Sequence, residues 1–120
     1  MIRSANWLGD AVMTVPALMA VRETYPDAHI AVVANPLVAQ LLENHPGCDE
    51  VIVYNKRAEH AGVLGMLRFA ADLRRRKFDC AILFQYAIEA GIMAFLAGIP
   101  RRLGFTTDGR RIFLTHPVPF

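Results

Sequence analysis

Three short apolar runs, separated by segments with helical periodicity, constrain the fold of this chain more than any other feature. The runs are rich in β-branched residues and bounded by turn residues, as buried strands are: HIAVVAN (29–35), DEVIVYN (49–55) and FDCAILF (78–84). Parallel strands need crossover connections, and these are usually helices. The alternation therefore predicts an α/β fold, a Rossmann-like parallel sheet with helices on both faces.

The segments around these runs predict four helices, over about 11–25, 36–47, 61–77 and 87–97. The first contains Pro16, which is expected to kink or divide it, and the last is apolar nearly all round and ends at Gly98. Periodicity predicts a buried face for the first and the third helix: Val12, Val15, Pro16 and Met19, and Val63, Met66, Leu67 and Ala70. The first strand is limited to residues 1–4, and short strands or extended edges are expected after Gly98.

Composition places the chain among single globular domains. Its 120 residues, 54% of them hydrophobic and 20% charged, predict one domain over 1–120. A net charge of +2 argues against nucleic-acid binding, and neither the two cysteines nor the four histidines have metal-ligand spacing. The longest apolar run, 90–100, is too short to span a bilayer, and no signal peptide precedes the domain. A cytoplasmic protein is expected.

The stretch from Asn6 to Asp10 is the first candidate site, because it directly follows the predicted first strand. Ligands of open parallel sheets bind at the carboxyl ends of the strands, and Gly9 lets a ligand approach the backbone. Asp10 has two interpretations, as a helix cap or as a reactive carboxylate, and for an isolated Asp at a helix start capping is the commoner. The absence of G-x-G-x-x-G argues against a nicotinamide enzyme.

Two segments together carry a family resemblance, RSANWLGDAVMTVPAL (3–18) and FQYAIEAGIMAFLAGIPRRLGFTTDGRRIFLTHPV (84–118). They resemble the N-terminal half of the ADP-heptose:lipopolysaccharide heptosyltransferases of glycosyltransferase family 9, most closely the heptosyltransferase II type. The resemblance implies the N-terminal lobe of the two-lobed GT-B architecture. In that architecture this lobe holds the sugar acceptor, and the C-terminal lobe holds the nucleotide sugar.

The resemblance also implies a role for each candidate residue. Asp10 becomes the general base of an inverting transferase that moves heptose from ADP-heptose to the lipopolysaccharide inner core. Because that acceptor carries carboxylates and phosphates, basic acceptor-binding loops are expected. The implied acceptor contacts are Asn6, Trp7, Gly9, Lys56, Arg57, Gln85, Arg110 and Arg111. Gln85 and the weaker candidate Glu89 occupy a loop where the family usually has a small polar pair.

Other arginines are interpreted from their position in the sequence. The cluster 74–77 ends an amphipathic helix, where cations complement the helix dipole and face water. Arg101 and Arg102 remain open between acceptor binding and a solvated role.

The resemblance implies no cofactor and no metal, because ADP-heptose is a donor substrate, expected to bind a lobe outside these residues. Alone, the chain is therefore expected to be inactive. It would work at the cytoplasmic face of the inner membrane, with peripheral membrane contact left open. The alternative is a non-catalytic sugar- or phosphate-binding module that has lost the donor lobe.

Overall fold

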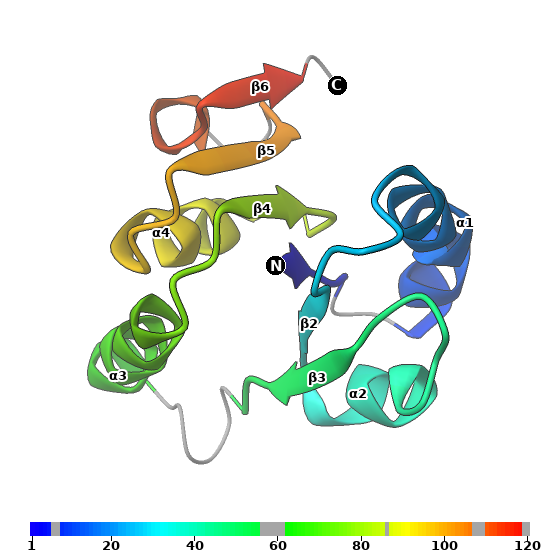
Figure 1. Ribbon diagram of the computed structural model, residues 1–120. Coiled ribbons are helices and arrows are strands. Elements are labelled where there is room, and N and C mark those ends of the chain that lie inside the picture. Colours follow the sequence, from blue (N-terminus) through cyan, green and yellow to red (C-terminus); the bar gives the residue numbers. More distant parts are fainter. Residues whose placement is uncertain (6–7, 56–61, 86, 107–109, 119–120) are drawn as a thin grey trace.

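The strands form one parallel sheet, as the sequence predicts. The computed structural model describes residues 1–5, 8–55, 62–85, 87–106 and 110–118 (Figure 1). Within these ranges a six-stranded sheet has the order β3-β2-β1-β4-β5-β6, and all of its pairings are parallel. The strands are β1 Ile2–Arg3, β2 Ala31–Ala34, β3 Glu50–Val53, β4 Cys80–Leu83, β5 Arg101–Phe105 and β6 His116–Val118.

Helices cover both faces of the sheet. They are α1 Leu8–Thr24, α2 Pro36–Leu42, α3 Gly62–Arg75 and α4 Ile88–Leu96, with a short 3-10 helix, η1, at Arg110–Phe113. Figure 1 shows α1 and α2 on one face and α3 and α4 on the other. Each face has its own buried cluster, one with Ile2, Val32 and Leu18 at its centre and one with Val33, Leu73 and Met93. The sheet is thus buried on both sides, which explains its continuously apolar strands.

The buried face of α1 differs from the prediction. Val12 is 51% exposed and Pro16 is exposed, whereas Ala11 and Leu18 are buried against the sheet. Apolar residues occur all around α1, so more than one stripe satisfies helical periodicity, and the contact with the sheet selects among them. The helix also continues through Pro16 as one element from Leu8 to Thr24, so it is not divided there.

The buried face of α3 includes the predicted Ala70 but is otherwise rotated relative to the prediction. Val63 is 72% and Leu67 is 43% exposed, while Phe69 and Leu73 are buried. The Phe69 ring lies 4.7 Å from the ring of Tyr54, centroid to centroid. Burying Phe69 and Leu73 removes more apolar area from water than burying Val63 would, which favours the observed face. Helix α2 ends at Leu42, shortly before the stop predicted at His45-Pro46-Gly47.

Helix α4 agrees with the sequence. Its small or flexible residues Ala90, Gly91, Met93 and Ala94 are buried. After Ala97, Gly98 adopts a φ of +70°, the left-handed conformation that commonly follows a helix end and that glycine adopts without strain. The helix leads into β5, and η1 connects β5 to β6. Of the two segments expected as short strands or extended edges, 100–105 contains β5, whereas 111–120 begins within η1 and contains β6 only at His116–Val118.

Candidate functional site

Asp10 lies in the first turn of α1, directly beyond the carboxyl end of β1, and it is exposed. It is the third residue of the helix, not the residue before it, so it does not occupy the N-cap position. At this place a carboxylate interacts favourably with the positive end of the helix dipole and still faces solvent. The structure therefore leaves the Asp10 side chain available for chemistry.

Gly9 adds open space beside Asp10. A Cβ built on Gly9 meets no heavy atom within 4 Å. A ligand can therefore approach the backbone closely at this turn. Asn6 and Trp7, the two other predicted site residues of this loop, lie outside the described residues.

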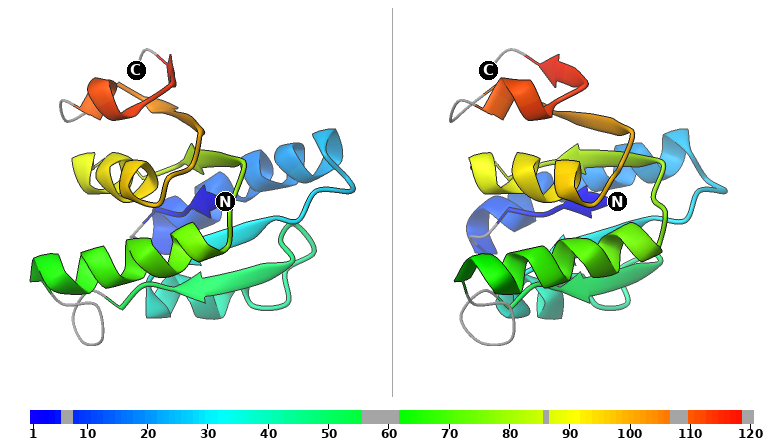
Figure 2. Two further views of the ribbon diagram at one scale, coloured as in Figure 1. Left: turned by 60° about the vertical axis from the view of Figure 1, so that its left-hand side comes forward. Right: turned by 90° about the vertical axis from the view of Figure 1, so that its left-hand side faces the viewer.

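Several helices begin at the carboxyl edge of the sheet. Figure 2 shows α1, α3, α4 and η1 beginning at the same edge. Arg111, in η1, is exposed, and the backbone of Arg110 belongs to the same element. Strands β1 and β5 have β4 between them, so their axes lie roughly 10 Å apart. Asp10 thus follows the third strand in the sheet order and Arg111 the fifth, at the same edge. Lys56 and Arg57 are predicted for this edge too but lie outside the described residues.

Gln85 has a structural contact in this loop. Its side-chain oxygen accepts a hydrogen bond of 2.9 Å from the backbone N–H of Ala87, the residue that precedes α4. This bond supports the entry into α4, where Ala87 itself has no side-chain cap. The predicted acceptor contact of Gln85 is neither supported nor contradicted by this bond and stays a prediction.

Sequence reasoning missed a group of side chains around the buried Arg3, below this edge. Arg3, the last residue of β1, is only 3% exposed, and its guanidinium lies 5.6 Å from the centroid of the Tyr54 ring. The Tyr54 side chain hydrogen-bonds to Glu89 in the first turn of α4. Burial lowers the pKa of Arg3, and the charge of Glu89 acts against that shift. Burial, together with Glu89, raises the pKa of Tyr54. The signal in the sequence was a charged residue inside the predicted first strand.

Arg101 and Arg102 lie away from Asp10. Both begin β5, so they stand toward the amino end of a parallel strand, while Asp10 follows a carboxyl end. The Arg102 guanidinium donates hydrogen bonds of 2.6 Å to the carbonyls of Ile99 and Phe113 and lies over the Phe95 ring. Arg102 therefore has a structural role, in holding η1 against the end of α4. The cluster 74–77 at the end of α3 is also toward the amino edge, in agreement with the solvated interpretation.

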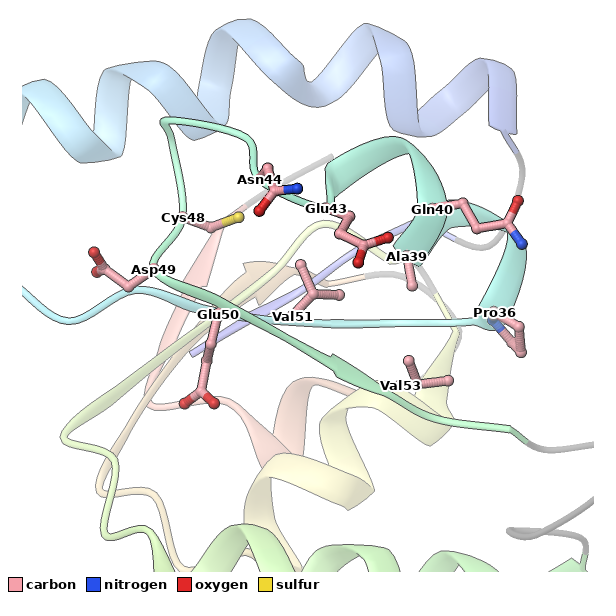
Figure 3. Close-up of a pocket in the computed structure, with 10 residues that line it drawn as sticks. All are labelled: Pro36, Ala39, Gln40, Glu43, Asn44, Cys48, Asp49, Glu50, Val51 and Val53. Carbon is pink, nitrogen blue, oxygen red and sulfur yellow. The ribbon is translucent and has the colours of Figure 1, made fainter.

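A cavity in the described part of the chain lies elsewhere. It has a volume of about 450 Å³ and lies between α2, the following turn and β3, at the edge of the sheet (Figure 3). Three carboxylates line it, those of Glu43, Asp49 and Glu50. Asp49 and Glu50 form ion pairs with Arg22 and Arg76, at 2.7 and 2.6 Å. An acidic lining does not suit an anionic acceptor, so this cavity is not the candidate site.

The described part of the chain has neither a metal-ligand group nor a membrane-spanning helix. In it, no His, Cys, Asp and Glu side chains group in threes in a way that could hold a metal ion. In the same ranges no helix combines the length and the apolar character needed to cross a membrane.

Comparison with known proteins supports the resemblance seen in the sequence. No family model matches the chain. It is 26% identical over 105 residues to lipopolysaccharide heptosyltransferase 2 of Escherichia coli and, equally, to that of Salmonella typhimurium. In each case the match covers 88% of this chain and 30% of the relative. The chain therefore spans less than a third of the length of these relatives.

Solved structures show the same fold. A family 9 glycosyltransferase from Veillonella parvula superposes with a TM-score of 0.87 at 24% identity, over 98% of this chain and 34% of that one. The E. coli ADP-heptose heptosyltransferase II superposes with a TM-score of 0.84 at 22% identity, over 99% and 34%. The chain thus has the Rossmann-like fold of part of one lobe of a GT-B glycosyltransferase and is similar in sequence to heptosyltransferases.

Proposed function

We propose that this chain forms the acceptor side of an inverting heptosyltransferase that transfers heptose from ADP-heptose to the lipopolysaccharide inner core, with Asp10 as general base. The observation that carries the proposal is the exposed Asp10 carboxylate beyond the carboxyl end of β1, beside the open space at Gly9. The sequence similarity to heptosyltransferase 2 supports the reaction class.

The chemistry asked of Asp10 is a single proton transfer. An acceptor hydroxyl attacks the anomeric carbon of the donor heptose from the face opposite the leaving group. The new C–O bond forms as the bond to ADP breaks, and ADP leaves with its electron pair. Asp10 takes the hydroxyl proton as the oxygen becomes positively charged. General-base catalysis of this kind contributes about 100- to 10,000-fold and needs hydrogen-bond reach to the hydroxyl.

The remaining candidates are proposed as acceptor contacts. Arg111 is an exposed cation at the same edge as Asp10 and suits a phosphate or carboxylate of the inner core. Arg110, Lys56 and Arg57 are proposed for the same role, and Asn6, Trp7, Gly9 and Gln85 for contacts to the sugar. No cofactor or metal is proposed.

ADP-heptose is proposed to bind a second lobe outside these residues, since the matched relatives are about three times as long. The exposed side chains near Asp10 support the proposal that a second lobe contacts this surface. Val12 is 51% and Met13 is 79% exposed, which places two apolar side chains in solvent next to the carboxylate. Apolar patches beside a polar site commonly mark a contact surface. Work at the cytoplasmic face of the inner membrane, with peripheral contact, is part of the same proposal.

The test is heptose transfer by the complete protein that contains this chain. ADP-heptose and a lipopolysaccharide acceptor truncated in its inner core are mixed with the protein, and ADP release and acceptor mass are measured. The Asp10→Asn variant should lower kcat about 100- to 10,000-fold with little change in the KM of the acceptor. Asp27→Asn, which changes another exposed aspartate far from this turn, is the control.

The outcomes separate the alternatives. Near wild-type turnover in Asp10→Asn refutes the general-base assignment. Saturable binding of the acceptor without transfer by the wild-type protein favours the non-catalytic sugar- or phosphate-binding module instead.

A further inference from the structure

Arg3 has an unusual location for a charged residue. It ends the central strand β1 and is 3% exposed, between the paired strands β2 and β4. Met1 belongs to the cluster beneath α3 and α4 and Ile2 to the opposite one, so Arg3 points to the α3 and α4 side. A guanidinium is costly to bury unless it is paired and hydrogen-bonded. Here Tyr54 and Glu89 supply a ring and an opposite charge.

The hydrogen bonds of Arg3 show which backbone groups its guanidinium contacts. Its Nη1 donates to the carbonyl of Ser4 at 3.1 Å and to that of Val33 at 3.4 Å. The backbone N–H of Ser4 donates to the same Val33 carbonyl at 2.9 Å. The carbonyl of Arg3 accepts bonds from the N–H groups of Phe84 and Gln85. Main chain and side chain of Arg3 therefore fix the carboxyl end of β1 against its neighbours.

The fixed strand end lies close to Asp10 along the chain. Ser4 and Ala5 are 2% and 7% exposed, and α1 begins at Leu8. Three peptide links join Ala5 to Leu8, so their Cα atoms are at most roughly 11 Å apart. A shift of the strand end beyond this covalent reach must move the start of α1. The position of Ala5 thus constrains where the first turn of α1, and Asp10 with it, begins.

We propose that Arg3 is a positioning residue for Asp10, which it places through the Ser4 carbonyl at the end of β1. The proposal rests on the proposed function for its effect on turnover, but not for its effect on the backbone. Arg3 itself is too deeply buried to touch the acceptor. Its role is to keep the proposed base at a fixed distance from the edge of the sheet.

The test uses two variants, because removing Arg3 alone would take away a positive charge that interacts with the Glu89 carboxylate. Arg3→Lys keeps the charge but not the planar guanidinium, whose Nη1 contacts both carbonyls while the group lies over the Tyr54 ring. Arg3→Met combined with Glu89→Gln removes both charges at once. Arg102→Lys is the matched control, since Arg102 also donates to two carbonyls and lies over a ring, at the other end of its strand.

Hydrogen exchange of the complete protein, followed in peptides covering residues 1–13, is the first readout. Both Arg3 variants should accelerate exchange there by about 10-fold or more, as local opening becomes easier. Arg102→Lys should accelerate exchange only around residues 99–115. Unchanged exchange of 1–13 in both Arg3 variants would overturn the proposal, whatever the protein catalyses.

Steady-state kinetics is the second readout. A base displaced by about 1 Å lowers turnover about 100-fold, so the double variant should lose kcat by that factor while the KM of the acceptor changes little. Arg3→Lys should lose less. Accelerated exchange with unchanged kcat refutes positioning of the base. If the wild-type protein transfers no heptose, the proposed function fails, and the exchange measurement alone decides the role of Arg3.

Discussion

The buried face of α3 can be tested with one substitution made at two places on the same helix. Leu73 is 1% exposed and packs in the cluster beneath α3 and α4, whereas Leu67, on the face predicted from the sequence, is 43% exposed. Leu→Ala removes three carbon atoms beyond Cβ in both cases. The two variants therefore have the same chemistry and differ in burial.

The structure sets the expected magnitudes. Removing three fully buried carbons at Leu73 forfeits about 2.4 kcal/mol of transfer free energy, at about 0.8 kcal/mol per methylene. A residual cavity brings the loss of unfolding free energy to about 3–4 kcal/mol. At Leu67 a little over half of the side chain is buried, so the transfer loss is about 1.4 kcal/mol. The better helix propensity of alanine reduces the loss to about 1 kcal/mol.

Urea denaturation followed by circular dichroism measures both values. With a slope of about 1–3 kcal/mol per molar urea, a difference of about 2 kcal/mol separates the two midpoints by roughly 1 M. Equal midpoints, or a lower midpoint for Leu67→Ala, would refute the observed face and restore the one predicted from periodicity. Should Leu73→Ala be too unstable to purify, Leu73→Met compared with Leu67→Met provides a milder probe of the same two positions, at less than about 1.5 kcal/mol.

Two further predictions concern acid stability and the turn beside Asp10. The backbone N–H of Ile30 and the Arg22 guanidinium lower the pKa of Asp49, and hydrogen bonds from His29 and Arg76 lower that of Glu50. Carboxyls with a depressed folded-state pKa stabilise the protein above their unfolded pKa and cease to do so as pH falls through the folded one, so the urea midpoint should drop below about pH 5. Asp49→Asn should flatten that drop relative to Asp27→Asn, and identical pH profiles would contradict the assignment. Gly9→Ala should raise the unfolding free energy by about 0.5–1 kcal/mol, because Gly9 lies inside α1 with no heavy atom within 4 Å of an added Cβ. The same variant should lower heptose transfer if the acceptor occupies that space, and unchanged turnover would place the acceptor elsewhere.

The strands were predictable because burial on both faces removes the need for polar residues. The cores of β2 and β4, AVVA and CAIL, are continuous apolar runs, and helical segments between them leave a parallel sheet as the consistent arrangement. The position of Asp10 followed from the same topology. The proposed role of Asp10 did not follow from the topology, because an exposed carboxylate in a first helical turn does not by itself indicate a reaction. The family resemblance was needed to suggest a substrate.

The helix faces were less predictable, and the reason lies in the residues themselves. In α1 and α3 apolar side chains occur on the solvent side as well, among them Met13, Val63 and Leu64. Helical periodicity then fits more than one stripe. The fit of Phe69 against Tyr54, which follows β3, chooses the face of α3. That choice depends on a tertiary contact and not on any pattern within the helix.

Arg3 illustrates how a charged residue in a strand can be interpreted. Because sites in open parallel sheets lie at the carboxyl ends, a charge at the last position of the central strand either reaches a ligand or secures the strand end. Local sequence cannot decide between the two, since the partners of Arg3 come from the end of β3 and from α4. Its bonds to the carbonyls of Ser4 and Val33, together with its deep burial, favour the second. Because Arg3 is only 3% exposed, the charge of the proposed acceptor must be met by exposed cations such as Arg111.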